Sequence, residues 1–575
     1  MRLEPSLEAL GTQAIRDALG VEAPALVRPA NPSHGDYQIN GVLPLAKELK
    51  KQPRELALAV ADKVRQAEAI ESAEVAGPGF INIKLAPAWV AAQVLEQAVD
   101  VARDGVPPAA KPLRVVVDFS SPNIAKQMHV GHLRSTIIGD ALCRLLRFLG
   151  HEVIGDNHLG DWGTQFGLLI VGMRRFGDQA ALDREPIEEL ERVYKLASAE
   201  AKQDPAFADE ARAELAKLQK GDPDNRALWE RFSSATRVEL DKSYARLDVH
   251  FDQWLGESAY EEMLPGVVAQ LRESGLARED QGALCVFFDD QPELGKSPMI
   301  VQKKDGAYLY STTDIATALY RRDHFHAERA IYVVGNPQAL HFKQLFALLG
   351  RMGVDMQLEH VSFGSVLGKD GKALKTREGG TIKLAELLDE AVARAAEHMR
   401  RAREENVLEL SDAQIEQLAP VVGIGAVRYA DLMQNRASDY QFDWDKMISF
   451  KGNAGPYLQY AHARIRAIFR KGEVDPATLP LKTKPRLSHP AELALAKHLL
   501  RFADAVTQAA EQSLPHLVCE HVYDLARLFS AFYEACPVLK AEPEDRDARL
   551  MLAWSVGRQV RRGLGLLGIE APERM

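Results

Sequence analysis

The feature that most restricts the fold of this chain is a run of strand, loop, helix and strand between residues 113 and 155. It opens with Leu-Arg-Val-Val-Val-Asp-Phe, a β-branched stretch typical of a strand buried in a parallel sheet. A helix is predicted over residues 132–149, because every fourth residue from Leu133 is apolar and Gly150 stops it. A second strand follows at 152–155. This βαβ unit predicts a doubly wound, Rossmann-like parallel sheet.

The chain has 575 residues, too many for one hydrophobic core, and three domains are predicted in an α/β multidomain protein. Residues 1–108 mix helical and strand periodicity and predict an α+β domain. Residues 109–389 hold the parallel sheet, which is expected to resume with strands at 307–310 and 330–334. A charged helical insertion is expected within this domain at about 180–250. Residues 390–575 predict an all-α domain.

Composition excludes several classes of protein. No apolar run approaches the roughly 18 residues that a membrane span needs, and the first ten residues lack the apolar core of a signal peptide. We therefore expect a cytoplasmic protein with no membrane contact. Four widely spaced cysteines form no Cys-x-x-Cys pair, which predicts buried thiols, no zinc site and no disulfide framework: Cys143, Cys285, Cys519 and Cys536. The net charge of −10 leaves nucleic-acid binding open, because local basic patches decide it.

The segment Pro122-Asn-Ile-Ala-Lys-Gln-Met-His-Val-Gly-His132 lies between the first strand and its helix. Open parallel sheets bind ligands at this edge, and a helix N-terminus there suits phosphate. His129 and His132 are three residues apart and can face one site, while Gly131 lets a ligand approach the backbone. As four letters, His-x-Gly-His is more typical of helix-capping or core histidines than of a ligand site. Its position between strand and helix favours a nucleotide site.

This motif resembles the HIGH signature of the class I aminoacyl-tRNA synthetases, and longer stretches resemble the arginyl-tRNA synthetases of bacterial type. Those stretches are residues 117–140, 157–167 and 452–464, and the resemblance extends over essentially the whole chain. It implies an N-terminal additional tRNA-binding domain, a catalytic domain and a helical anticodon-binding domain.

The implied reaction activates L-arginine with ATP, as its Mg²⁺ complex, and transfers the arginine to the 2′-hydroxyl of the terminal adenosine of tRNA(Arg). AMP and pyrophosphate are released. The resemblance implies a monomer without zinc or an organic prosthetic group. Members of the family usually need bound tRNA before they activate arginine.

By this resemblance, His129 and His132 donate to phosphoryl oxygens in the transition state. The second class I signature, Lys-Met-Ser-Lys, is missing, and a Gly-rich segment with four cations replaces it at 368–380. Taken alone, such a segment is more typical of a solvated basic loop. We expect ATP to contact His129, Gly131, His132, Lys375, Thr376 and Arg377. Lys126 is expected to stand in for the missing lysine.

Arginine recognition requires carboxylate or amide oxygens, because a guanidinium is planar, charged and carries five donors. By resemblance the pocket is lined by Asp118, Ser120, Asn123, Tyr310, Asp314 and Gln338. We expect Asp314 to pair with the guanidinium; the alternative for Asp314 is a helix N-cap. Asp118, Ser120 and Asn123 are expected to hold the backbone end of the amino acid. The turn at 334–338, Val-Gly-Asn-Pro-Gln, departs from the usual family sequence.

Contacts with tRNA are expected at both ends of the chain. Tyr37, within Gly-Asp-Tyr-Gln, belongs to the part that resembles the family's domain for the tRNA elbow. Near the anticodon we expect aromatic and basic side chains that suit splayed bases and phosphates: Tyr457, Tyr460, Arg464 and Arg466. Without the resemblance, this pattern is more typical of core aromatics beside a solvated face.

Two other functions are alternatives to an arginyl-tRNA synthetase. Another class I synthetase, of cysteinyl or glutamyl type, is one alternative, but the cysteinyl type needs zinc ligands that this chain lacks. The other is a tRNA-binding protein that has lost catalysis. That function predicts loss of the histidines or the pocket acids, and His129, His132, Asp118 and Asp314 are all present.

Overall fold

The computed structural model describes residues 2–31, 33–368, 370–372, 374, 382–479 and 484–575. The chain packs as two compact units, Met1–Pro108 with Phe450–Met575, and Ala109–Ser449. Residues 390–449 therefore pack with the residues of the parallel sheet, whereas the division predicted from the sequence grouped them with the later helices. Lys375, Thr376 and Arg377 lie outside the described residues.

The unit Ala109–Ser449 is built on a parallel sheet with the strand order β11-β10-β5-β6. Its strands are β5 (Arg114–Asp118), β6 (Glu152–Asp156), β10 (Arg329–Tyr332) and β11 (Gln357–His360). Helix α5 (Val130–Phe148) connects β5 to β6, so the predicted βαβ unit is confirmed. The strand expected at 330–334 corresponds to β10.

The prediction of a strand at 307–310 is wrong. Only Tyr308 forms an isolated bridge, to Gln302, and Tyr310 is already the first residue of α12 (Tyr310–Asp323). The hydroxyl groups of Ser311 and Thr312 donate to the carbonyls of the preceding strand, at Ile300 and Val301. The Tyr-Ser-Thr-Thr sequence, which looks like a strand by composition, is thus the anchored first turn of a helix.

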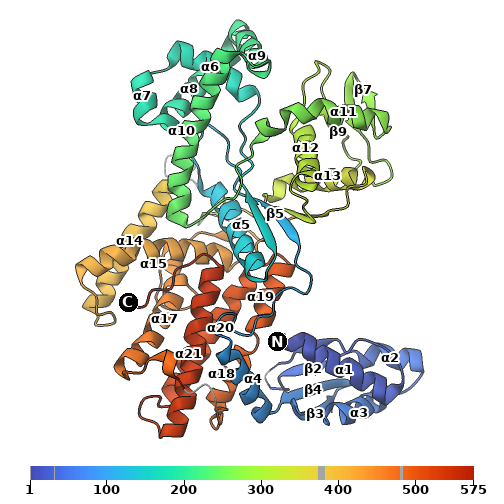
Figure 1. Ribbon diagram of the computed structural model, residues 1–575, viewed down its shortest axis with the longest axis vertical. Helices are drawn as coiled ribbons and strands as arrows, with labels where there is room; N and C mark the ends of the chain where they lie inside the picture. Colours follow the sequence, from blue (N-terminus) through green and yellow to red (C-terminus); the bar gives the residue numbers. More distant parts are fainter. Residues whose placement is uncertain (1, 32, 369, 373, 375–381, 480–483) are drawn as a thin grey trace. The chain divides into compact units, whose positions relative to one another are not determined.

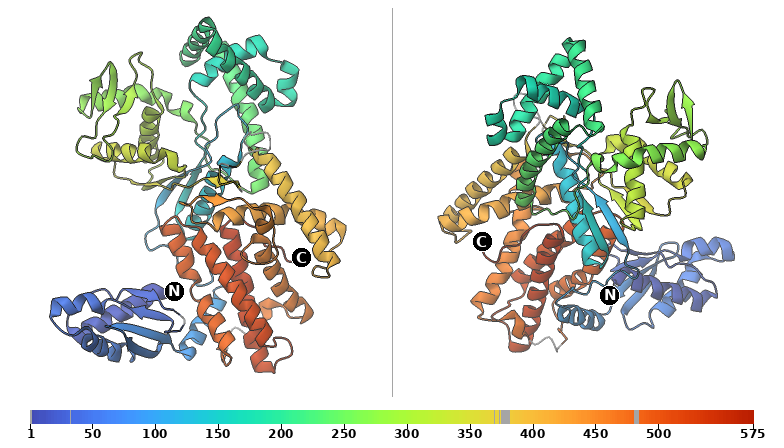
Figure 2. Two further views of the ribbon diagram at one scale, coloured as in Figure 1. Left: turned by 180° about the vertical axis from the view of Figure 1, so that it is seen from behind. Right: turned by 45° about the horizontal axis from the view of Figure 1, so that its top comes forward.

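Two further lobes extend from this sheet (Figures 1 and 2). The helices of the insertion expected at about 180–250 are α7 (Gln179–Arg184), α8 (Pro186–Gln203), α9 (Pro205–Gln219) and α10 (Pro223–Leu247). The lobe begins earlier than expected, because α6 (Thr164–Phe176) packs against α8 and α9. The second lobe holds an antiparallel sheet that was not predicted, with its helices: η1 (Glu257–Met263), α11 (Leu264–Glu273), β7 (Ala277–Asp280), β8 (Ala283–Val286), β9 (Met299–Gln302), η2 (Asn336–Gln338) and α13 (Ala339–Arg351).

The rest of this unit is mostly helical: α14 (Leu384–Glu404), α15 (Asp412–Leu432) and α16 (Trp444–Met447). One exception corrects the expectation of an all-α region after residue 390. The two-residue strand β13 (Tyr440–Gln441) pairs in parallel with β12 (Val366–Leu367). The pairing exists because residues 433–443 run beside the segment that leads into the Gly-rich loop.

The other unit combines an antiparallel sheet, of order β1-β2-β4-β3, with a helical bundle. Its first part contains α1 (Leu3–Leu19), β1 (Val27–Pro29), β2 (Tyr37–Ile39), α2 (Val42–Leu49), α3 (Pro53–Val64), β3 (Ile70–Ala76), β4 (Phe80–Leu85) and α4 (Pro87–Val99). Its second part contains α17 (Gly455–Lys471), η3 (Pro476–Thr478), α18 (Pro490–Leu499), α19 (Phe502–Glu511), α20 (His516–Ala535) and α21 (Pro543–Leu566). The α+β and helical characters are as predicted.

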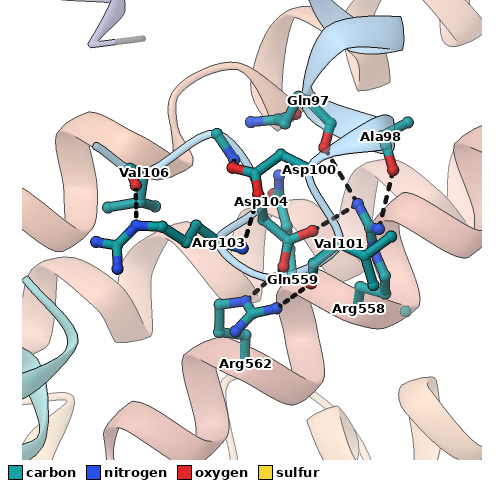
Figure 3. A network of polar contacts seen from close by, with 12 residues as sticks. Gln97, Ala98, Asp100, Val101, Arg103, Asp104, Val106, Arg558, Gln559 and Arg562 are labelled. Atoms are coloured by element: carbon teal, nitrogen blue, oxygen red, sulfur yellow. Dashed lines mark hydrogen bonds and ion pairs between the residues drawn. The ribbon is translucent and has the colours of Figure 1, made fainter. Parts of the chain in front are cut away.

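A buried charge network joins the two parts of this unit (Figure 3). Asp104, which is fully buried, pairs with Arg558 at 2.7 Å and with Arg562 at 2.5 Å, both from α21. Arg558 also donates to the carbonyls of Gln97 and Ala98 in the last turn of α4. A cation is favourable there, because the C-terminal carbonyls of a helix carry partial negative charge.

All four cysteines are buried free thiols, as predicted. Among the described residues, every helix is too short or too polar to cross a membrane. Within the same residues, no group of three or more His, Cys, Asp or Glu side chains is placed to hold a metal ion.

Candidate active site

The His-x-Gly-His segment forms the N-terminus of α5, at the carboxyl edge of the parallel sheet. His129 is the N-cap, and its Nδ1 accepts the backbone N–H of Gly131 at 3.0 Å. The Nδ1 of His132 accepts the backbone N–H of His129 at 3.1 Å. Because each Nδ1 accepts a hydrogen bond, each neutral ring carries its proton on Nε2. The histidines therefore cap the helix and still offer one donor each to a ligand.

Both rings are uncharged at neutral pH. Burial, together with the neighbouring His129 and Lys126, lowers the pKa of His132 to about 4. Burial and the charge of Lys126 also lower the pKa of His129. The two side chains are thus suited to donate hydrogen bonds to phosphoryl oxygens without changing their protonation.

A pocket of about 320 Å³ lies between His129 and the segment that leads into the Gly-rich loop. His129 and Gly131 line one side, and Phe363 and Leu374 belong to the other. Arg134, fully buried, connects the two sides because its guanidinium donates to the carbonyl of Gly364 at 2.7 Å. The pocket has the position expected of a nucleotide site in an open parallel sheet.

Lys126 lies beside the histidines, on the other side of the loop. Its ammonium group is 5.3 Å from the centre of the Tyr194 ring, on α8 of the insertion. It also lines a pocket of about 430 Å³, together with Glu188 and Lys383. Its charge is close enough to lower the pKa of both histidines.

A third pocket, of about 330 Å³, contains the side chains of Tyr310, Gln338 and His341. Nε2 of His341 lies 2.6 Å from Oδ2 of Asp314, and the Tyr310 ring packs edge-on to the His341 ring. The N-cap of α12 is Leu309, so the alternative role of Asp314 as an N-cap is wrong. Asp314 instead points from the second turn of the helix to a residue in the pocket wall.

Asp118 and Ser120 are buried and already have partners within the protein. Oδ2 of Asp118 accepts a hydrogen bond from Arg321 at 2.8 Å. The hydroxyl of Ser120 is hydrogen-bonded to Thr136 and to Tyr244. Asn123 is exposed, and a side chain at Gly160 would collide with its amide oxygen. Of these three, Asn123 is the one whose side chain faces solvent.

The residues expected to contact tRNA differ in their surroundings. The Tyr37 side chain is 3% exposed in β2, because it points to the core of its sheet, so its position does not support an RNA contact. On α17 the guanidinium of Arg464 lies 5.2 Å from the centre of the Tyr533 ring, and Tyr457 packs against Tyr523. Arg466 pairs with Glu573, near the end of the chain. Tyr460, also on α17, packs edge-on to Phe450.

Sequence reasoning missed two charged residues near the pockets, Glu257 and Arg321. Burial, together with the nearby carboxylates of Asp314 and Asp161, raises the pKa of Glu257 to about 7. Arg321 is fully buried against the sheet. Glu257 lies in an acidic stretch, and Arg321 lies in an Arg-Arg-Asp run on a helix. Such runs usually lie on solvent-exposed faces, so neither indicates a buried charge.

The parallel sheet and the histidine pair at its edge are the defining features of the class I aminoacyl-tRNA synthetases. Residues 96–444 match the family model described as tRNA synthetases class I (R), catalytic domain. Residues 6–85 match the arginyl tRNA synthetase N terminal domain, and residues 458–575 match the DALR anticodon binding domain. The chain belongs to the arginyl-tRNA synthetase family.

Individual proteins agree over the whole chain. The arginine–tRNA ligase of Shigella dysenteriae is 46% identical over 99% of this chain and 100% of its own length. Arginyl-tRNA synthetase from Plasmodium falciparum superposes with a TM-score of 0.84 at 30% identity, covering 100% of this chain and 99% of the other. The Thermus thermophilus enzyme gives 0.81 at 29% identity, with both chains fully covered.

Proposed function

We propose that this chain is an arginine–tRNA ligase. It activates L-arginine with ATP, bound as the Mg²⁺ complex, and passes the arginine to the 2′-hydroxyl of the terminal adenosine of tRNA(Arg). One observation carries this assignment: the pocket of His129 and the pocket of Tyr310 and His341 share Pro337 as a wall residue. A phosphate-facing site and a site with a carboxylate for a guanidinium are therefore adjacent at one edge of the sheet.

The proposed activation step uses the residues of these pockets and those of the Gly-rich segment. The carboxylate of arginine attacks the α-phosphorus of ATP, and pyrophosphate leaves. Negative charge develops on the phosphoryl oxygens, and the Nε2–H groups of His129 and His132 stabilise it. Gly131 admits the nucleotide to the helix N-terminus, and Lys375, Thr376 and Arg377 hold its phosphates. The side chains need to position and to donate, not to form a covalent intermediate.

The guanidinium is bound at the other pocket by Asp314, with Tyr310 and Gln338 beside it. Asn123 holds the backbone end of the amino acid, and Asp118 and Ser120 support that end from below the surface. Lysine carries a single ammonium group and cannot satisfy a site built for a fork of donors. Sites built on buried hydrogen bonds reject such analogues by on the order of 10⁴-fold, so no editing site is required.

Glu257 is expected to add a second carboxylate to guanidinium binding. Its pKa is about 7 in the free protein, so the group is mostly protonated at pH 6 and mostly ionised at pH 8. The guanidinium stays charged throughout and favours the ionised form. The KM for arginine should therefore fall roughly tenfold as the pH rises from 6 to 8. Glu257→Gln should raise KM and remove this dependence, measured by arginine-dependent exchange of pyrophosphate into ATP; an unchanged pH profile would exclude the role.

Lys126→Met should slow arginine activation by roughly tenfold, because one half-solvated cation near the phosphates is lost. The measurement is kcat in pyrophosphate exchange at saturating arginine and ATP, with tRNA present. Lys242→Met is the matched control, since Lys242 lines the same pocket but pairs with Glu239 on α10. If Lys126→Met keeps the wild-type rate, Lys126 does not replace the lysine of the missing signature.

The remaining assignments complete the proposal. Residues 1–108 form a tRNA-binding domain, residues 109–449 the catalytic domain and residues 450–575 an anticodon-binding domain. On α17, Tyr457, Tyr460, Arg464 and Arg466 face the anticodon arm. The protein acts as a cytoplasmic monomer without zinc or a prosthetic group.

The transfer step has a direct test. tRNA(Arg) ending in 3′-deoxyadenosine should be charged with labelled arginine, whereas tRNA ending in 2′-deoxyadenosine should not. The reverse preference would overturn the assigned hydroxyl, and no charging of either or of natural tRNA would overturn the ligase function.

A further inference from the structure

One side chain of α12 reaches the ends of three neighbouring strands. Nη2 of Arg321 lies 2.8 Å from a carboxylate oxygen of Asp118, the last residue of β5, and 2.8 Å from one of Asp156, the last residue of β6. Its guanidinium also lies 5.1 Å from the centre of the ring of Tyr332, the last residue of β10. Arg321 and Asp156 are both fully buried, so neither can touch a substrate.

The same helix carries the residues proposed to recognise arginine. Asp314 precedes Arg321 by seven residues, which is about two helical turns, so the two side chains share one face about 10 Å apart along the axis. The carboxylate of Asp314 is also close enough to Tyr332 to raise the pKa of that phenol. Arg321 thus fixes α12 along its own axis, relative to the strand ends.

Strand β5 connects this anchor to the other reacting group. Asp118 ends β5, and the chain then runs through residues 119–128 to His129 and His132 at the start of α5. The Arg321–Asp118 contact therefore joins the helix that holds the guanidinium-binding carboxylate to the strand that leads to the phosphate-facing histidines. The Arg321–Asp156 contact ties the same anchor to β6, on the far side of β5.

We propose that Arg321 is a positioning residue that sets the distance between Asp314 and the histidine pair, and so selects amino acids by side-chain length. The proposal rests on the proposed arginine–tRNA ligase function. The carboxylate of the amino acid must meet the α-phosphorus while its guanidinium stays on Asp314. An amino acid that is one methylene longer places one of these groups wrongly, and a misplacement of about 1 Å can cost 10²-fold in rate.

Both carboxylates accept from the same nitrogen, Nη2 of Arg321, and its two N–H bonds have fixed directions in the plane of the guanidinium. A lysine at position 321 keeps a buried positive charge, but its three N–H bonds rotate together about the Cε–Nζ bond and do not fix the directions of the two carboxylates. Asp156→Asn keeps the shape of the side chain and removes one of the two charges. Either change should let α12 shift along its axis while the substrate-contacting residues remain intact.

The test compares L-arginine with L-homoarginine, which has one more methylene, in pyrophosphate exchange with tRNA present. In the wild type, kcat/KM should favour arginine by roughly 10- to 200-fold, the range for one methylene. In Arg321→Lys and Asp156→Asn this ratio should fall about tenfold, because arginine loses more than homoarginine. Arg322→Lys is the matched control; Arg322 pairs with Asp323 at the surface, and the wild-type ratio should persist.

A merely structural role predicts a different result. Partial unfolding would lower kcat/KM for both amino acids equally and leave their ratio unchanged. Ratios within twofold of wild type in both variants, with native circular dichroism, would overturn the proposal while leaving the ligase function intact. If the wild type uses neither amino acid, the ligase function itself is wrong.

Discussion

Asp314→Asn is expected to lower kcat/KM for arginine by on the order of 10⁴-fold, the loss typical of a buried site that no longer matches its ligand. The asparagine has nearly the same shape, but it removes the charge and replaces one of the two acceptor oxygens with an NH2 group, which cannot pair with a guanidinium that has only donors. The hydrogen bond of 2.6 Å to His341 is changed as well. The measurement is arginine-dependent pyrophosphate exchange with tRNA present.

Asp323→Asn is the matched control for this change. Asp323 lies on the same helix, is exposed and pairs with Arg322, so wild-type exchange is expected. A loss of less than tenfold in Asp314→Asn, with thermal unfolding unchanged, would mean that another group carries guanidinium recognition.

His132→Asn is expected to lower kcat by 10² to 10³-fold, with the KM for ATP changed little. The oxygen of asparagine can take the place of Nδ1 and keep the hydrogen bond from the backbone of His129, so α5 remains capped. The donor at the position of Nε2 is lost, and removal of one donor from a developing oxyanion typically costs this much. The measurement is kcat for exchange at saturating ATP and arginine.

His132→Gln provides the contrast, because its amide nitrogen lies near the position of Nε2. This variant should recover part of the rate, and it should do so even if the helix cap is weakened. Equal losses in both variants would indicate that His132 acts through the helix and not through its donor. Because the pKa of His132 is lowered to about 4, kcat should show no titration of this ring between pH 6 and 8.

The capping geometry explains why the His-x-Gly-His pattern was ambiguous in the sequence. From the sequence, capping and phosphate binding are alternatives, yet each ring uses Nδ1 for the cap and keeps Nε2 for a ligand. The cap also fixes the tautomer that the proposed chemistry requires. Each of the two histidines therefore caps the helix and also serves the proposed function.

The catalytic sheet was predictable where local sequence decides structure. The β-branched run of β5 indicates a buried strand, and the apolar residue at every fourth position of α5 indicates a helix. Neither prediction needs knowledge of distant partners. The small β7-β8-β9 sheet was missed because its first strand, Ala277–Asp280, is mostly exposed and charged. Tyr310 was placed in a strand because the anchoring carbonyls of Ile300 and Val301 lie outside the local pattern.

The site was predictable only in part, because buried charges depend on distant partners. Arg321 meets Asp156 across 165 residues and Asp118 across 203 residues of sequence. No repeating pattern in the local sequence indicates that these residues form a buried pair. The sequence therefore suggests a substrate ligand at Asp118 and gives no sign that Arg321 is buried. Glu257 came from the unpredicted lobe and was missed for the same reason.

The most direct test of the assigned function is exchange of labelled pyrophosphate into ATP, with each standard amino acid in turn, with and without total tRNA. We expect exchange with arginine and with no other amino acid, and only when tRNA is present. Exchange with a different amino acid, or none under any condition, would contradict the assignment of this chain as an arginine–tRNA ligase.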